Sequence, residues 1–138
     1  MLTFVELQRR CIFVPEMTKD KLTVVVGAST NPERYSNLAI RRLLNSGYAV
    51  KAAGLREGEV VGVKIDAAKT MIEGVDTVTL YVGPDHQASW RDYIFALNPR
   101  RIIFNPGTEN RNFEEAAASR GIEVMHACTL VLLSTRSY

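Results

Sequence analysis

The sequence predicts a single α/β domain with a Rossmann-like, doubly wound parallel sheet of five to six strands in three layers. Two observations favour this fold. Short β-branched runs alternate with apolar residues at helical spacing throughout residues 21–138. The chain has 138 residues, of which 46% are hydrophobic, and this is enough for one buried core. Parallel strands need long crossover connections of nearly invariant hand, so the alternation predicts a sheet covered by helices.

The first strand and helix are the clearest part of this pattern. Leu22–Val26 is a β-branched run that ends at Gly27, and it suits a central strand covered on both faces. Apolar residues then recur at helical spacing between Leu38 and Leu44, and Gly47 follows where a helix C-cap is expected. Residues 48–53 predict a second strand.

The rest of the chain repeats the alternation. Residues 60–65 predict a short third strand, with Asp66 as a cap for a brief helix. A strand over 75–82 is followed by a helix with apolar residues at i, i+3, i+4 and i+7, namely Trp90, Tyr93, Ile94 and Leu97. The remaining elements are expected over 101–104 (strand), 113–117 (helix), 122–125 (strand) and 130–133 (a last buried element).

Residues 1–20 are expected to form an N-terminal extension, an amphipathic segment outside the domain of residues 21–138. Glu6 and Arg9-Arg10 stand where a signal peptide needs an apolar core, and no run approaches the roughly 18 apolar residues of a membrane span. We therefore expect a cytoplasmic protein with no membrane partner.

Charge and metal-ligand spacing exclude two further classes of partner. Seventeen basic and fifteen acidic side chains leave a net charge of +2, which does not predict a nucleic-acid partner. The two cysteines, Cys11 and Cys128, have no metal-ligand spacing, and His86 and His126 complete no cluster with them. We expect no metal site.

Ligands of doubly wound sheets bind at the carboxyl ends of the strands, near the point where strand order reverses. The first loop there, residues 27–36, begins with Gly27, which lets a phosphate approach the backbone. Ser29, Ser36 and the N-terminus of the following helix offer donors, and Arg34 can bind a phosphate in bidentate fashion. The alternative is that Gly27 and Ser29 only form a turn and Ser36 only caps a helix.

The same loop departs from two known fingerprints. Ser29 and Pro32 stand at the second and third glycine positions of G-x-G-x-x-G, so the standard dinucleotide fingerprint is not satisfied. Asn31 stands at the last glycine of G-x-S-x-G, so Ser29 lacks the local signature of a hydrolase nucleophile. A hydrolase is therefore not expected.

The end of the second predicted strand distinguishes between nucleotide ligands. NAD-binding domains place a carboxylate there to accept hydrogen bonds from the ribose diol, whereas this chain has Ala53-Gly-Leu-Arg56. A cation at this place, Arg56 or Lys51, favours the phosphorylated ribose that NADP and coenzyme A (CoA) both carry. The alternative is that these cations are solvated surface charges beside Glu57 and Glu59.

Four segments in register, VVVGASTNPERYSN, VGPDH, FNPGTEN and CTLV, make the chain resemble the CoA-binding protein family. These small proteins are similar to the nucleotide-binding domain of succinyl-CoA synthetase α subunits. The resemblance covers roughly residues 21–133, and it implies that CoA or an acyl-CoA is the ligand. It implies that residues 27–29 and 34–36 hold the phosphates and that residues 54–56 face the adenosine. The family commonly has Asn-Pro-Lys where this chain has Ala53-Gly-Leu-Arg56.

The resemblance also implies that residues 82–84 line the neighbouring wall and that residues 105–107 form the next loop. There Asn105 can offer an amide, or the three residues serve only as a turn. The full candidate set is Gly27, Ala28, Ser29, Asn31, Arg34, Tyr35, Ser36, Gly54, Arg56, Val82, Gly83, Pro84, Asn105, Pro106 and Gly107.

No catalytic residues are expected, because no nucleophile and base pair can be assigned. The resemblance implies binding without ligation, since synthetases of this superfamily use a phosphorylated histidine and a grasp domain from other chain segments. We expect a non-enzymatic module that binds a small nucleotide ligand. The sequence does not determine whether it also has a protein partner. The alternatives are an NADP-binding oxidoreductase component, and a regulatory or scaffold protein with a vestigial nucleotide site.

Overall fold

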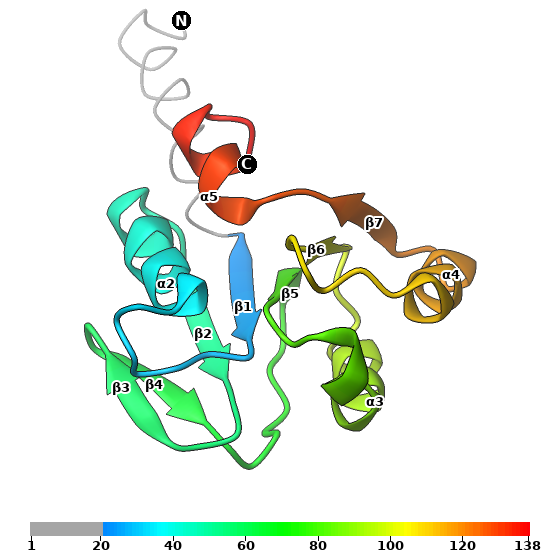
Figure 1. Ribbon diagram of the computed structural model, residues 1–138, viewed down its shortest axis with the longest axis horizontal. Helices are drawn as coiled ribbons and strands as arrows, with labels where there is room; N and C mark the ends of the chain where they lie inside the picture. Colours follow the sequence, from blue (N-terminus) through cyan, green and yellow to red (C-terminus); the bar gives the residue numbers. More distant parts are fainter. Residues whose placement is uncertain (1–20) are drawn as a thin grey trace, which may run out of the picture.

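The computed structural model describes residues 21–138, which form a seven-stranded sheet between two layers of helices (Figure 1). The N-terminal extension predicted for residues 1–20 lies outside the described residues. The strands are β1 (Leu22–Val26), β2 (Val50–Ala53), β3 (Gly58–Val60), β4 (Val63–Asp66), β5 (Val75–Leu80), β6 (Arg101–Phe104) and β7 (Glu123–His126). The helices are α2 (Tyr35–Asn45), α3 (Ala88–Leu97), α4 (Arg111–Ser119), α5 (Thr129–Ser134) and the short 3-10 helix η1 (Pro84–His86).

The strand order is β3-β4-β2-β1-β5-β6-β7, and every neighbouring pair is parallel except β3 with β4. The chain moves outward from β1 to β2 and β4, and then returns to place β5 on the other side of β1. The six parallel strands therefore have the order of a doubly wound Rossmann sheet, with the reversal between β1 and β5. The predicted fold class is confirmed.

The seventh strand corrects the prediction of one strand over residues 60–65. This segment is an antiparallel hairpin in which Val60 pairs with Val63. The two turn residues, Val61 and Gly62, have φ angles of +48° and +84°. Positive φ at both central residues is the signature of the tight turns that suit twisted hairpins.

The brief helix expected after Asp66 is also absent from the described chain. The Asp66 carboxylate instead accepts hydrogen bonds from the backbone N–H of Ala68 (3.2 Å) and of Thr70 (2.8 Å). These bonds, the one from Thr70 foremost, lower the pKa of Asp66. A carboxylate that binds backbone amides two and four residues ahead closes a turn without needing a helix to follow it.

Two apolar clusters fill the interfaces between the sheet and the helices. On one face, α3 and α4 pack against the sheet through side chains such as Ile94 and Phe113. On the other face, α2 packs through Ile40, and α5 adds the partly buried Leu133. The predicted apolar face of α3 is confirmed, because all four of its residues are buried: Trp90, Tyr93, Ile94 and Leu97.

The C-terminal segment is less buried than the sequence predicts. Residues 130–133 belong to α5, whose buried residue is Thr129, whereas Val131 is 55% exposed. Four consecutive apolar residues on a helix point to all sides, so a surface helix can bury only part of such a run. The Thr129 hydroxyl instead anchors α5 by a 2.7 Å hydrogen bond with the hydroxyl of Thr79 on β5.

Candidate functional site

The loops that follow β1, β2, β5 and β6 meet at the carboxyl edge of the sheet, beside the reversal between β1 and β5. All candidate residues from the sequence lie in these loops or in the first turn of α2. The topology therefore brings together segments that are up to 80 residues apart in the chain, from Gly27 to Gly107. This is the edge at which doubly wound sheets bind their ligands.

The loop after β1 starts by crossing the end of β2. The N–H groups of Gly27 and Ala28 both donate to the Ala53 carbonyl, at 2.9 and 3.0 Å. A Cβ on Gly27, whose φ is +93°, would lie 2.9 Å from Cγ2 of Val82 and 3.0 Å from the carbonyl carbon of Tyr81. The structure thus gives Gly27 a packing role against the chain that leaves β5, and its own N–H is already paired.

The rest of this loop is held by its own polar groups. The Asn31 N–H donates to the Ser29 hydroxyl (3.1 Å), and the Asn31 side-chain oxygen accepts from the Glu33 N–H (2.9 Å). Asn37 is 1% exposed, and its amide donates to the Ser29 carbonyl (3.0 Å). Its side-chain oxygen accepts from Arg41 (2.9 Å). The loop is therefore preorganised, and the Asn37 that fixes it was not among the sequence candidates.

The first turn of α2 follows directly. Arg34 is the N-cap residue with extended backbone, so Ser36 lies inside the helix and does not cap it. The first N–H groups of a helix have no acceptor within the helix, which leaves those of Tyr35 and Ser36 for another partner. Arg34 is exposed, and Tyr35 is 72% exposed. This turn therefore presents donors, a helix dipole and a cation at the carboxyl edge.

The loop after β2 lies directly against the loop after β1. A Cβ on Gly54 would stand 2.6 Å from the Ala28 carbonyl oxygen, and one on Gly58 would overlap Cγ2 of Thr30. Beyond this contact the chain turns outward, where Leu55 is 83% exposed and Arg56 is exposed. Arg56, the cation expected to bind a ribose phosphate, is thus accessible to solvent at this edge of the sheet.

The loop after β6 uses its first side chain for structure. Asn105 is 1% exposed, and its amide donates to the Thr79 hydroxyl (2.7 Å) and to the Leu80 carbonyl (2.9 Å). Its side-chain oxygen accepts from the Thr129 N–H (2.9 Å). Both donor bonds of the Asn105 amide are thus made within the protein, which favours the alternative that residues 105–107 serve as a turn, and a contact of Asn105 with a ligand stays a prediction. Pro106 and Gly107 remain exposed.

Three further titratable side chains, His126, Cys128 and Tyr81, end or follow the strands β7 and β5 near this edge. His126 pairs with the carboxylate of Glu114 on the neighbouring helix α4, and Cys128 is a half-buried free thiol. Burial raises the pKa of the Tyr81 hydroxyl above its ordinary value.

Within residues 21–138, no three His, Cys, Asp or Glu side chains are placed to hold a metal ion. No helix described there is long and apolar enough to cross a membrane.

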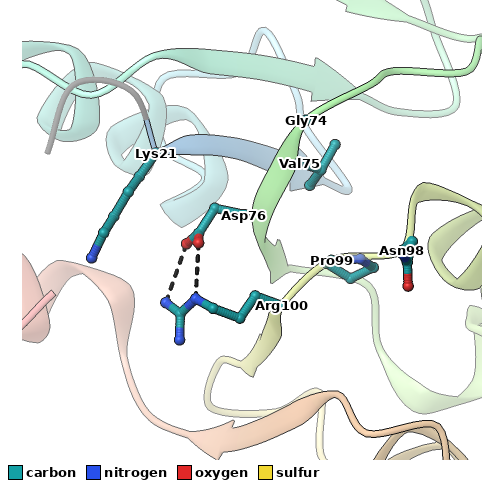
Figure 2. A pocket seen from close by; sticks show the side chains of 7 residues that line it. All are labelled: Lys21, Gly74, Val75, Asp76, Asn98, Pro99 and Arg100. Carbon is teal, nitrogen blue, oxygen red and sulfur yellow. Dashed lines mark hydrogen bonds and ion pairs between the residues drawn. The ribbon is translucent and has the colours of Figure 1, made fainter. Parts of the chain in front are cut away.

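A cavity of about 530 Å³ lies at the opposite, amino edge of the sheet. Figure 2 shows the Asp76 carboxylate and the Arg100 guanidinium facing each other there, with Lys21 nearby. Their closest atoms are 2.8 Å apart. Burial raises the pKa of Asp76, but hydrogen bonds from Arg100 and Thr77 outweigh it and lower the pKa overall. Asp76 and Arg100 in this cavity are paired with each other, and none of the sequence candidates lines it.

The lowered pKa predicts how Asp76 affects stability. A carboxyl with a depressed folded-state pKa stabilises above its unfolded pKa of about 3.9, and this stability is lost as the pH falls through the folded pKa. We expect Asp76→Asn to lower the free energy of unfolding by about 1 kcal/mol at pH 7, since Arg100 is half exposed. The difference should shrink below pH ~4 in urea unfolding curves. An unchanged difference at pH 3 would contradict the ion-pair explanation.

The strand order and the two helix layers define a Rossmann-type domain. A family model for the CoA binding domain matches residues 21–134, which is most of the chain. The chain therefore belongs to the CoA-binding domain family, and the resemblance read from the sequence is confirmed. A comparison with curated proteins gave no match.

Solved structures share the fold. One, of an uncharacterized protein, is 46% identical, with a TM-score of 0.83 over 86% of this chain and 98% of that chain. A Thermus thermophilus protein is 23% identical, with a TM-score of 0.76 over 94% and 98% of the two chains. The dinucleotide forming acetyl-coenzyme A synthetase 1 of Ca. Korarchaeum cryptofilum is 22% identical, with a TM-score of 0.65. That match covers 83% of this chain but 27% of the synthetase, so the fold corresponds to one part of a larger protein.

Proposed function

We propose that this protein is a cytoplasmic module that binds CoA or an acyl-CoA at the carboxyl edge of its sheet and performs no catalysis of its own. The observation that carries the proposal is the arrangement around α2. A preorganised loop ends at the N-terminus of α2, whose first amides have no acceptor within the helix, and the exposed cations Arg34 and Arg56 belong to the two loops that contact each other at Ala28 and Gly54. Membership of the CoA-binding domain family supports the choice of ligand.

The strand order implies how such a ligand would lie. The loops follow one another along the edge in the order β2, β1, β5 and β6. With the adenosine at the β2 loop and the phosphates at the first turn of α2, the pantetheine arm extends across the loops after β5 and β6. Because the Gly27 and Ala28 amides are paired with Ala53, the phosphate donors in this arrangement are Tyr35, Ser36 and Arg34.

Arg56 provides the sharpest test of the ligand, because it is proposed to bind the 3′-phosphate that distinguishes CoA from dephospho-CoA. A lost charge-assisted hydrogen bond costs about 1.5–3 kcal/mol, or roughly ten- to more than a hundredfold in affinity. Calorimetry should show that the wild type prefers CoA over dephospho-CoA and that Arg56→Ala loses most of this preference. Arg42→Ala, which removes an exposed cation from the last turn of α2, should retain it.

The outcomes separate the competing assignments. If Arg56→Ala weakens both ligands equally, Arg56 does not bind the phosphate, and Lys51 is the next cation to test. NADP also carries a ribose phosphate, so it is the appropriate competitor: tighter binding of NADP than of CoA would replace the CoA assignment by the oxidoreductase alternative. If neither nucleotide binds while the fold is intact, the site is vestigial.

A further inference from the structure

The buried amide of Gln87 joins two of the loops at the carboxyl edge. Gln87 is 1% exposed and follows η1, directly before α3. Its Nε2 donates to the Val82 carbonyl (2.8 Å) in the loop after β5 and to the Thr108 carbonyl (2.6 Å) in the loop after β6. Its Oε1 accepts a 3.0 Å hydrogen bond from Nδ2 of Asn110. Each polar atom of this side chain is therefore used between loops.

Gln87 stands at the start of a helix, yet its side chain does not bind the helix. It is the N-cap residue of α3, where short side chains that can accept from the helix amides are preferred, and its side chain makes no cap hydrogen bond. Asn110 occupies the equivalent position before α4 and does cap its helix, since its Oδ1 accepts from the Phe113 N–H (3.2 Å). The remaining Asn110 amide donates to Gln87. The starts of α3 and α4 are thus tied together by two amide side chains.

Among side chains of this length, only a primary amide satisfies this environment. Two carbonyls require two N–H donors on one atom, and the Asn110 amide requires an acceptor on the other. A carboxylate would place an oxygen against the Val82 and Thr108 carbonyls, and an apolar side chain would leave both without a donor. The hydrogen-bonding groups around this position, rather than the packing of its side chain, therefore require glutamine.

The bridged loops leave open space on their outer sides. A Cβ built on Gly83 or on Gly107 would meet no atom within 4 Å, although both residues belong to loops fixed by Gln87. We infer that Gln87 is a positioning residue, which sets the separation of the loops after β5 and β6 so that they can hold the pantetheine arm of the ligand. This inference rests on the proposed binding of CoA, and it adds a specific role for a side chain that does not itself touch the ligand.

Two ligands distinguish this role from a general contribution to folding. Adenosine 3′,5′-bisphosphate carries the nucleotide but lacks the pantetheine arm. We expect Gln87→Met to weaken CoA on the order of tenfold, because two buried carbonyls lose their donor. The affinity for the bisphosphate should change by no more than about twofold, which is a much smaller effect than the tenfold loss expected for CoA. Asn45→Leu, which removes an exposed amide at the end of α2, away from α3 and α4, is the matched control and should change neither affinity.

Gln87→Glu allows a second test, the pH dependence of CoA affinity, which is measured on a single folded variant. The introduced carboxylate repels the two carbonyls, whereas its protonated form regains one O–H donor. Its CoA affinity, measured by calorimetry, should therefore rise as the pH is lowered from 8 to 5, relative to wild type over the same range. If Gln87→Met does not fold, this comparison still decides the question.

The possible failures are distinguishable. Wild type that binds neither CoA nor the bisphosphate refutes the proposed function itself. Wild type that binds both, together with Gln87 variants that lose the two ligands equally or lose neither, refutes only the positioning role.

Discussion

Gly54→Ala is expected to lower the free energy of unfolding by about 3 kcal/mol, at the upper end of the usual cost of overpacking. The added Cβ would lie 2.6 Å from the Ala28 carbonyl oxygen. This oxygen cannot easily retreat, because the Ala28 N–H is held by the Ala53 carbonyl. The substitution must therefore separate the loops after β1 and β2. Urea unfolding at neutral pH measures the effect directly.

Gly83→Ala is the matched control for this prediction. Gly83 has φ −64° and an added Cβ there would meet no atom within 4 Å, so the same chemical change should leave stability nearly unchanged. Equal stability of the two variants would show that the β1 and β2 loops are not in close contact. Gly54→Ala should also weaken CoA, since it displaces the loop that leads into α2.

The fold was predictable where apolar periodicity is strong and uninterrupted. Leu22–Val26 reads as a covered central strand, and it forms β1 with β2 and β5 on its two sides. The α3 residues at helical spacing are all buried. In both elements the local pattern agrees with the position in the sheet, so tertiary contacts do not override it.

The hairpin of β3 and β4 was not predictable in the same way. Two-residue turns with positive φ are usually signalled by Asn-Gly or Asp-Gly, but this turn has Val61 before Gly62. A β-branched residue at that position continues the apparent run of strand residues, so the sequence reads as one strand. Cross-strand pairing of Val60 with Val63 holds the turn in a conformation that valine itself disfavours.

The candidate site was predictable as a set of loops, because topology brings the carboxyl ends of parallel strands to one edge. The use of individual groups was not predictable. Whether the Gly27 backbone approaches a phosphate or a neighbouring loop depends on what lies opposite it, which here is Tyr81 and Val82. Similarly, nothing in the sequence distinguishes the buried amides of Asn37 and Gln87 from exposed ones, because they bind backbone carbonyls, which every residue carries.

Asn105→Leu is expected to be as destabilising as Gly54→Ala, by about 3 kcal/mol. The variant fills the same space but leaves the Leu80 carbonyl and the Thr129 N–H without their side-chain partner, and each buried group left unpaired costs about 1–3 kcal/mol. Because Thr129 begins α5, this helix should lose protection from hydrogen exchange before the sheet does. Asn45→Leu, at an exposed position of α2, is the control and should change stability by less than about 0.5 kcal/mol.

Asn105→Asp tests the same contacts without a change of shape. The new carboxylate directs an oxygen at the Leu80 carbonyl, where the amide had donated, and burial in this place raises its folded-state pKa above the unfolded value of about 3.9. A group with a raised folded pKa destabilises progressively as the pH rises from the unfolded pKa to the folded pKa, because the unfolded state releases the proton while the folded state still holds it. The difference from wild type should therefore be larger at pH 7 than at pH 4 in urea unfolding. A difference independent of pH, or a stable Asn105→Leu variant, would mean that the Asn105 amide does not hold β5 to α5.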